Sequence, residues 1–353
     1  MKTFSQLLLS LALLTISIQL NGQCCDANST SSCCSADGYV SHRPDGQAPI
    51  GVMGDHYHHK GGLMFSYRYM NMSMDGNRAG SNEVNDMVIF QNYMLAPQTM
   101  SMQMHMPGIM YAPAKRLTFM LMSNYLINEM NLAGMDGTQH YHQTKGIGDT
   151  RVSAVLGFWK AKKQSLHLNA GLNIPTGSIT ESESGHMHHE GHQMTKMPYP
   201  MQLGSGTWDA LFGLTYLGQK PQFSWGIQAL GTFRTGENSE GYRLGNQYRL
   251  NSWIAYKLND LISFSFRTTG ISTEKITGSD AELMPMMAPT TNAMNFGGEQ
   301  INGNFGINFY VPFGTMKGLR IGAEYGLPFY QNVNGIQMNQ SHFLTAGLKY
   351  SLF

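Results

Sequence analysis

The sequence predicts an all-β protein, a transmembrane antiparallel up-and-down β-barrel of about 12 strands. Three observations lead to this fold class. Segments with an apolar residue at every second position recur along the chain, and the connections between them alternate between short and long. Charged residues make up only 13% of the chain, whereas soluble domains average about 25%. A transmembrane strand shows lipid only its alternate residues, so a mean hydropathy of -0.25 agrees with such a barrel.

The alternation is the direct signal of strands with one apolar face. In 223–234, residues such as Phe223 and Ile227 alternate with polar Ser224 and Gln228. Segments of this kind lie at about 61–74, 98–111, 116–127, 148–160, 164–175, 207–218, 222–235, 246–258, 261–273, 300–312, 318–330 and 341–352.

The connections between these segments fall into two classes. Short ones lie around Ala114, Lys162 and Thr315, at 218–221 and at 259–260. Long ones are expected at about 75–97, 128–147, 176–206, 236–245, 274–299 and 331–340. Short periplasmic turns and long external loops are typical of outer-membrane barrels. The soluble rivals, a large β-sandwich or a lipocalin-like barrel, would carry charged outward faces, and closure of a membrane barrel removes exposed strand edges.

The N-terminus has the order of a secretory signal peptide over residues 1–22, because Lys2 precedes the apolar stretch Leu7–Leu20 and Gly22 stands near the cleavage point. The stretch is shorter than the roughly twenty residues that a membrane helix needs. A rival interpretation makes Cys24 the lipidated first residue of a lipoprotein, although Gln23 stands where a small residue is expected.

Residues 23–60 are expected to form a periplasmic segment, largely disordered and containing Cys and His, ahead of the barrel at 61–353. Its four cysteines are Cys24, Cys25, Cys33 and Cys34. In an oxidising compartment they form disulfides by default, with a pairing that sequence leaves open. The alternative is a thiolate metal site.

The last strand is apolar on one face and ends at Phe353. Such a C-terminus resembles the signal that the bacterial barrel-assembly machinery reads. We therefore expect that machinery and outer-membrane lipid as partners, and the bacterial outer membrane as the location. A net charge of +1 without a basic stripe predicts no nucleic-acid partner.

Several corner motifs carry a family resemblance: the run from Ala48 to His56, 146–149 (GIGD), 174–177 (IPTG), the run from Tyr199 to Asp209 (YPMQLGSGTWD) and 328–331 (PFYQ). Over about 45–353 the chain resembles the β-barrel outer-membrane family named after the MetA pathway of phenol degradation. The resemblance implies an outer-membrane barrel and transport. Its motifs mark barrel corners and carry no chemistry, so they do not name a substrate.

Polar members of the alternating segments are expected to line the lumen, since an Arg or Lys turned to lipid would cost about 2–4 kcal/mol at the midplane. The lumen-lining residues predicted in this way are Arg68, Arg151, His167, Asn169, Asn173, Asp209, Gln228, Arg267, Asn302, Asn304, Asn308, Arg320 and Glu324. They either cross-link a narrow barrel or line a diffusion path, and an N-terminal segment that plugs the bore would decide between the two.

Methionine is unusually abundant, with 27 residues, many in Met-x-Met order. Met70, Met72 and Met74 are expected to face the lumen with Arg68. Met100, Met102, Met104 and Met106 alternate with Ser101, Gln103 and His105 and are expected to face lipid instead. Thioethers are soft ligands that prefer Cu(I), so such a ladder could pass copper from site to site. The other interpretation is an adaptable apolar filler.

Histidines cluster in the connections and suggest a site for copper or zinc, with copper favoured, although no cofactor is required. The main group lies in the third long connection, His186, His188, His189 and His192, with Met194 and Met197. A second group, His140 and His142, shares that side, and a third, His56, His58 and His59, lies on the periplasmic side. The alternative is a solvated loop rich in glycine and histidine.

Taken together, these features predict an outer-membrane channel or transporter for small molecules or ions, linked to copper or other metal handling. The alternative is a surface metal-binding protein without transport, and a membrane-embedded hydrolase ranks third. We expect no enzyme activity, because no Gly-x-Ser-x-Gly elbow occurs and the isolated Gly204-Ser205-Gly206 reads as a turn.

Overall fold

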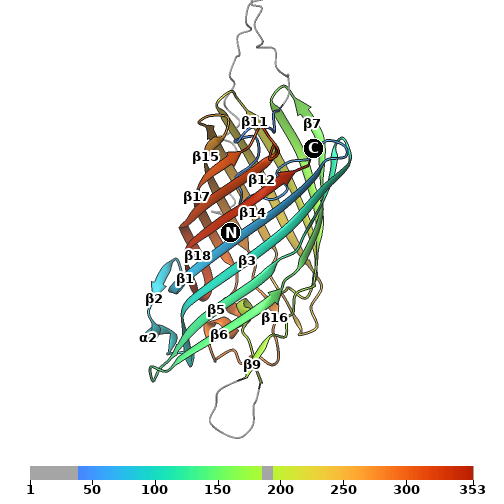
Figure 1. The fold of residues 1–353 in the computed structure, drawn as a ribbon. Coiled ribbons are helices and arrows are strands. Elements are labelled where there is room, and N and C mark those ends of the chain that lie inside the picture. The colour runs from blue at the N-terminus through green and yellow to red at the C-terminus, as the bar shows by residue number, and fades with distance from the viewer. Residues whose placement is uncertain (1–38, 185–193, 353) are drawn as a thin grey trace, which may run out of the picture. The chain divides into compact units, whose positions relative to one another are not determined.

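The computed structural model describes residues 39–184 and 194–352. One antiparallel sheet closes on itself, because β1 (Leu63–Gly80) pairs with β3 (Leu95–Ala114) on one side and with β18 (Leu319–Ser351) on the other. The strands run obliquely around the barrel (Figure 1). From β3 to β18 the ring continues through β4 (Leu117–Met122), β7 (Thr150–Ala161), β8 (Gln164–Ile174), β11 (Trp208–Gln219), β12 (Phe223–Thr235), β14 (Gln247–Lys257), β15 (Ile262–Thr273) and β17 (Gly298–Tyr310).

The ring contains eleven strands, and the longest of them, β18, crosses the wall twice. Residues 320–333 pair with β17, and residues 333–351 pair with β1. The chain reverses at Gly335, whose φ of 61° lies in the left-handed region that glycine adopts without steric cost. Eleven strands with one double crossing give twelve crossings, so the predicted all-β barrel of about 12 strands is confirmed.

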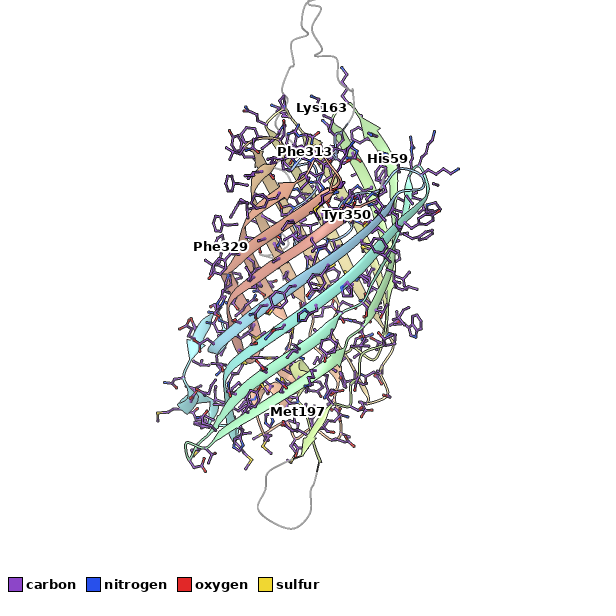
Figure 2. All side chains as sticks on the ribbon, viewed as in Figure 1. His59, Lys163, Met197, Phe313, Phe329 and Tyr350 are labelled. Carbon is purple, nitrogen blue, oxygen red and sulfur yellow. The ribbon has the colours of Figure 1, made fainter. Side chains whose placement is uncertain are left out.

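The barrel wall is apolar outside and polar inside. In β12, Phe223 and Phe233 are 40% and 38% exposed, whereas Ser224 and Gln228 are each 1% exposed. Phe329 of β18 likewise projects from the outer surface (Figure 2). Apolar side chains on this surface meet the hydrocarbon of a bilayer, while the inward polar groups find partners within the protein. The two-residue alternation of the sequence therefore translates directly into the two faces of the wall.

The two ends of the barrel differ. One end, which we term the short-turn end, carries the connections 115–116, 162–163, 220–222, 258–261 and 311–318. The opposite, long-loop end carries β2 (Asn82–Val84), α2 (Asp86–Ile89), β9 (Ser182–Ser184), β10 (Met194–Lys196), η1 (Tyr199–Met201), β13 (Tyr242–Arg243), β16 (Thr277–Gly278), η2 (Pro289–Thr291) and η3 (Ala293–Asn295). No helix of the described residues is long and apolar enough to cross a membrane.

Two of the long connections expected from the sequence are strands. Residues 128–147 lie mostly in a hairpin of β5 (Tyr125–Gly134), which also pairs with β3, and β6 (Gln139–Ile147). Residues 331–340 belong to β18 and include its reversal. The sequence pattern missed the hairpin because its outward face is polar: Glu129 accepts hydrogen bonds from Tyr141 (3.0 Å) and Gln143 (2.9 Å).

Residues 39–62, termed the plug, run inside the barrel toward the start of β1. Lumen side chains bind its backbone carbonyls: Gln228 Nε2 donates to the Met53 carbonyl (2.9 Å), and His167 Nε2 lies 3.2 Å from that of Gly54. Val52 also packs against Trp253. The expectation of a largely disordered periplasmic segment therefore fails for 39–60, because the lumen satisfies the polar backbone of this segment. Residues 1–38, which include the predicted signal peptide and all four cysteines, lie outside the described residues.

Candidate binding cavity in the barrel lumen

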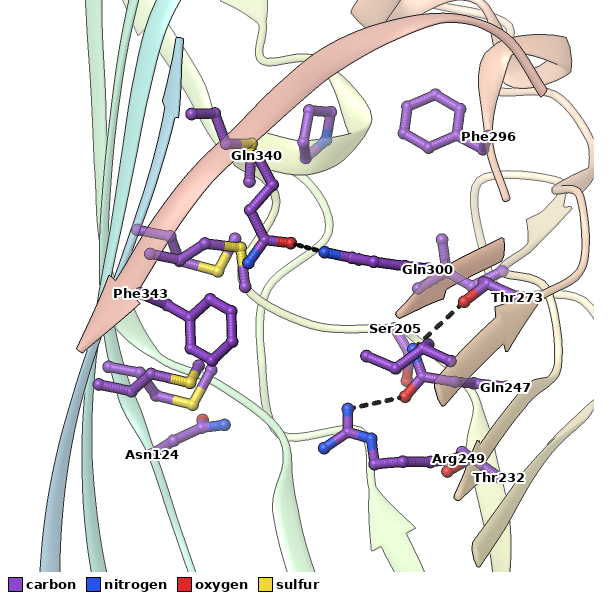
Figure 3. Close-up of a pocket in the computed structure, with 18 of the residues that line it drawn as sticks. Asn124, Ser205, Thr232, Gln247, Arg249, Thr273, Phe296, Gln300, Gln340 and Phe343 are labelled. Atoms are coloured by element: carbon purple, nitrogen blue, oxygen red, sulfur yellow. Dashed lines mark hydrogen bonds between the residues drawn. The ribbon is translucent and has the colours of Figure 1, made fainter. Parts of the chain in front are cut away.

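A cavity of about 750 Å³ occupies the lumen between the plug and the long-loop end. Gly51 and Met53 of the plug form part of its boundary, and the walls come from strands on all sides of the barrel. Figure 3 shows two unlike walls facing each other. Methionine sulfurs gather beside Phe343 on one side, and Gln247, Arg249 and Thr273 stand on the other.

The methionine wall is built by the register of β1 and β3. Three methionine pairs lie directly opposite each other across these strands: Met70 and Met104, Met72 and Met102, and Met74 and Met100. Met106 and Met122 continue the wall toward the plug. The expectation that Met100 to Met106 face lipid is wrong, because residues paired across a sheet share one face and the β1 methionines face the lumen.

The polar residues that alternate with these methionines lie on the outside. Tyr67 OH and His105 Nδ1 are 2.7 Å apart, and Tyr69 OH donates to Gln103 Oε1 over 3.3 Å. Tyrosine hydroxyls from the neighbouring strand thus satisfy these polar groups, which makes the outward position tolerable. This partnership could not be predicted from the sequence, because it depends on the strand register.

The cavity also carries positive charge, both beside the methionine wall and opposite it. Five arginines line the cavity: Arg68, Arg151, Arg234, Arg249 and Arg267. Arg234 forms an ion pair with Asp209, and Arg267 forms one with Glu324, with Nε and Oε1 2.9 Å apart. The other three make no ion pair with a carboxylate of the described residues. Arg68 donates to the Val52 carbonyl over 3.3 Å. Arg151 donates to Asn173 Oδ1 over 2.9 Å, and Arg249 donates to Gln247 Oε1 over 3.1 Å.

One further carboxylate, Asp149, lines the cavity. It accepts hydrogen bonds from the Gly177 backbone (3.1 Å), the Ser205 backbone (2.9 Å) and Ser205 Oγ (2.7 Å). Five guanidinium groups line the cavity with Asp149, and Asp209 and Glu324 pair with two of the five, so positive charges exceed negative ones by two. A low-dielectric wall focuses this potential into the lumen.

No protein-family model matches the chain, and no curated protein is similar to it in sequence. Among solved structures, it is similar to the crystal structure of the COG4313 outer membrane channel from Pseudomonas putida F1, with a TM-score of 0.57 and 13% identity over 84% of this chain and 97% of that chain. This chain has the fold of an outer-membrane channel. Its place in the bacterial outer membrane is accordingly as predicted.

Two porins are less similar to this outer-membrane barrel. The KdgM porin has a TM-score of 0.41 and 10% identity over 82% of this chain and 99% of that chain. The NanC porin has a TM-score of 0.40 and 9% identity over 80% of this chain and 98% of that chain. The resemblance to the phenol-degradation family stays a prediction, since no family model matches.

The lumen residues predicted from the sequence all turn inward in the outer-membrane barrel, in three groups. Those that line the cavity are Arg68, Arg151, Asn173, Arg267 and Asn302. Those that hold the plug are His167, Gln228, Arg320 and Glu324. Those that bond mainly within the wall are Asn169, Asp209, Asn304 and Asn308. Some members of this set therefore cross-link the barrel and others line a cavity.

Sequence reasoning missed two of the cavity arginines, Arg234 and Arg249. Both stand at the polar positions of alternating segments, next to outward Phe233 and Tyr248. The same rule that placed Arg267 inward would have found them.

The plug histidines do not converge as a group of three. The rings of His56 and His58 lie 4.9 Å apart at a T-shaped angle, but exposed His59 lies beside His42, with ring centroids 6.1 Å apart. His56 Nδ1 contacts Asp55 Oδ1 at 3.0 Å. Asp55 also accepts from the Ala48 backbone (2.8 Å) and lies 3.5 Å from Lys349 Nζ. The plug is thus tied to the last strand by a buried charge pair.

At the long-loop end, His142 Nδ1 lies 2.8 Å from Glu183 Oε2, and His140 contacts Thr138. Residues 186, 188, 189 and 192 and the side chain of Met194 lie outside the described residues. Met197 is only 2% exposed and packs against Met100, Met130 and Met201. Its position is that of a packing residue beneath the loops.

The long loops are also tied together by charge. Lys196 Nζ lies 2.7 Å from Asp280 and 3.3 Å from Glu282, and it also contacts Glu240. These three carboxylates lie within 4.8 Å of one another, so the ammonium occupies the place where a cation would bind. Burial opposes the charge on Lys196, but hydrogen bonds to Asp280 and Glu240 prevail and raise its pKa. The hydrogen bond from Lys196 lowers the pKa of Glu240.

Proposed function

We propose that this protein is an outer-membrane channel for small molecules or ions, and that it passes hydrated anions in preference to hydrated cations. One observation carries the proposal: a lumen cavity of about 750 Å³ whose wall holds three arginines without a carboxylate partner among the described residues. Excess charge in a confined lumen raises the local concentration of counter-ions. The likeness to an outer membrane channel supports the fold-level part of this proposal.

The plug sets the condition for passage. It lies between the cavity and the short-turn end, and many of its contacts are hydrogen bonds to lumen side chains. Water can replace such bonds when the plug moves, so their net loss costs only about 0.5–1.5 kcal/mol each. A solute that reaches the cavity from the long-loop end therefore crosses only when the plug shifts.

Metal handling is the finer part of the proposal. The histidines of the third long loop, together with His140 and His142, offer imidazoles that suit copper and zinc, and His142 contacts Glu183 at the base of that loop. Calorimetry on the parent and on a variant with His186, His188, His189 and His192 replaced by Ala tests this loop site. Equal copper and zinc affinity in the two proteins would exclude it.

A hydrolase is not proposed. Ser205 Oγ donates to Asp149 Oδ2 over 2.7 Å and to the Thr207 carbonyl over 3.1 Å, and it contacts no histidine of the described residues. The hydroxyl thus braces the turn, and no base is placed to activate it as a nucleophile.

Planar-bilayer recording tests the channel. In a tenfold KCl gradient, we expect unitary currents and a reversal potential of the sign that chloride selectivity gives. A folded protein that inserts without unitary currents would contradict the channel and favour a surface metal-binding protein. A reversal potential of the potassium sign would contradict the anion preference alone.

A further inference from the structure

We propose that the methionine wall of the lumen binds a monovalent soft metal ion, Cu(I) or Ag(I), through the thioethers of Met70, Met72 and Met104. The inference rests on the proposed channel, since the lumen must admit the ion, and it names a substrate class for that channel. We term these three residues the thioether site.

The strand register brings the sulfurs within reach of one another. Met70 is the direct cross-strand partner of Met104, and Met72 is that of Met102. The Cβ atoms of such partners stand about 4.5–5.5 Å apart. Each methionine has three rotatable bonds beyond Cα, so two sulfurs of one pair and a third from the next can turn toward a common ion. Thioethers are the side-chain ligands that select Cu(I) over harder ions.

Packing alone does not account for this site. Farther toward the loops, Met74, Met100 and Met102 pack against an apolar cluster with Met130, Leu132 and Met201. Met70, Met72 and Met104 line the same cavity, but they are only half-buried and belong to no such cluster of the described residues. An apolar filler gains its free energy by leaving water, and these side chains remain in contact with the open lumen.

Successive methionines on one strand allow an ion to move. Residues two apart along a strand are separated by about 6.4–6.8 Å. Met74 with Met100, then Met72 with Met102, then Met70 with Met104 form a series of pairs running from the long-loop end toward the plug. Met106 and Met122 follow in the same wall. A weakly held ion can therefore pass between pairs of similar affinity without leaving sulfur ligation for long.

The arginines that line the cavity act as a filter. Their excess charge repels hydrated cations, and a hard ion gains nothing from thioethers that would offset this repulsion. A soft ion gains metal–sulfur bonds. Chloride complexes of Cu(I) and Ag(I) also carry no net positive charge, so such a complex approaches the arginines without repulsion. Selectivity then comes from two interactions: the arginines repel hydrated cations, and the thioethers bind the soft ion.

Competition with the Cu(I) chelator bicinchoninate tests the site on the purified full chain. Cysteines are alkylated first, and binding is measured without oxygen at pH 5.0, where exposed imidazoles are protonated and poor ligands. We expect Cu(I) binding in the parent, because a thioether carries no proton to lose. The variant with Met70, Met72 and Met104 all replaced by Leu is expected to lose at least tenfold in affinity, while Zn(II) binds neither protein.

A matched control is available in the same two strands and in β4. Met64, Met110 and Met120 are buried together with Val155 near the short-turn end and do not line the cavity. Replacing these three with Leu changes composition equally and is expected to leave Cu(I) affinity within twofold of the parent. Retained heat-modifiable mobility on gels reports that each variant is folded.

Equal Cu(I) affinity in the parent and in the Met70, Met72 and Met104 variant would overturn the thioether site, as would absence of micromolar binding in the parent. A loss of similar size in the control variant would also overturn it, since the effect would then be general. KCl conductance separates this inference from the proposed function. Conductance without Cu(I) binding would contradict the thioether site and support the channel. Cu(I) binding without conductance would contradict the channel and support the thioether site.

Discussion

The buried pair of Lys349 and Asp55 predicts how firmly the plug is held. In Lys349→Leu the carboxylate of Asp55 loses its cation but keeps hydrogen bonds from the Ala48 backbone (2.8 Å) and from His56 (3.0 Å). Removal of one partner from a buried pair costs about 3–5 kcal/mol. Here the separation of Nζ and Oδ1 is 3.5 Å and two hydrogen bonds remain, so we expect a loss nearer to about 2 kcal/mol in the free energy of plug docking.

A change of about 2 kcal/mol corresponds to roughly a 30-fold rise in the ratio of undocked to docked plug. The open probability of single channels should rise accordingly in Lys349→Leu. The double variant Lys349→Leu with Asp55→Asn removes the buried charge and keeps an acceptor for the Ala48 backbone. Its open probability should therefore return most of the way to that of the parent. An unchanged open probability in a folded Lys349→Leu protein would refute the view that this pair holds the plug.

Three other predictions follow from single features of the described chain. Arg249→Gln removes one unpaired charge from the cavity and should shift the reversal potential in a KCl gradient toward that of potassium; an unchanged potential would contradict the charge argument. Glu240 has a lowered pKa, so its stabilising contact with Lys196 is fully present above the ordinary value of 4.5 and is lost as pH falls from there through the lowered pKa of the folded state. Limited proteolysis of the long loops should therefore accelerate at pH 4 relative to pH 7 in the parent but much less in Lys196→Met, and equal pH dependence would exclude the contact as the cause. Introduced cysteines in 176–206 should react with a membrane-impermeant reagent on intact cells, whereas a cysteine at Lys162 should not; reaction at both would reverse or abolish the assigned orientation.

The strands and their two faces could be predicted from the sequence. A transmembrane strand must show apolar side chains to lipid and polar ones to the lumen, and this requirement acts on each residue and its immediate neighbours. Alternation around Phe223 and Phe233 therefore predicted both the strand and its orientation. The same local rule placed Arg68, Arg151 and Arg267 inward without knowledge of any partner.

The tertiary structure alone decided what depends on register and on distant partners. Met104 faces the lumen because β1 sets the face of β3, and His105 is tolerated outside because Tyr67 reaches its ring. The plug enters the barrel because acceptors and donors on several strands, such as Gln228, meet its backbone. Neither the strand register nor the contacts of the plug can be predicted from a short stretch of sequence. Hydrogen bonds and cross-strand pairs join residues far apart in the chain, so which methionines share a wall, and which lumen residues face a cavity, is fixed only when the barrel closes.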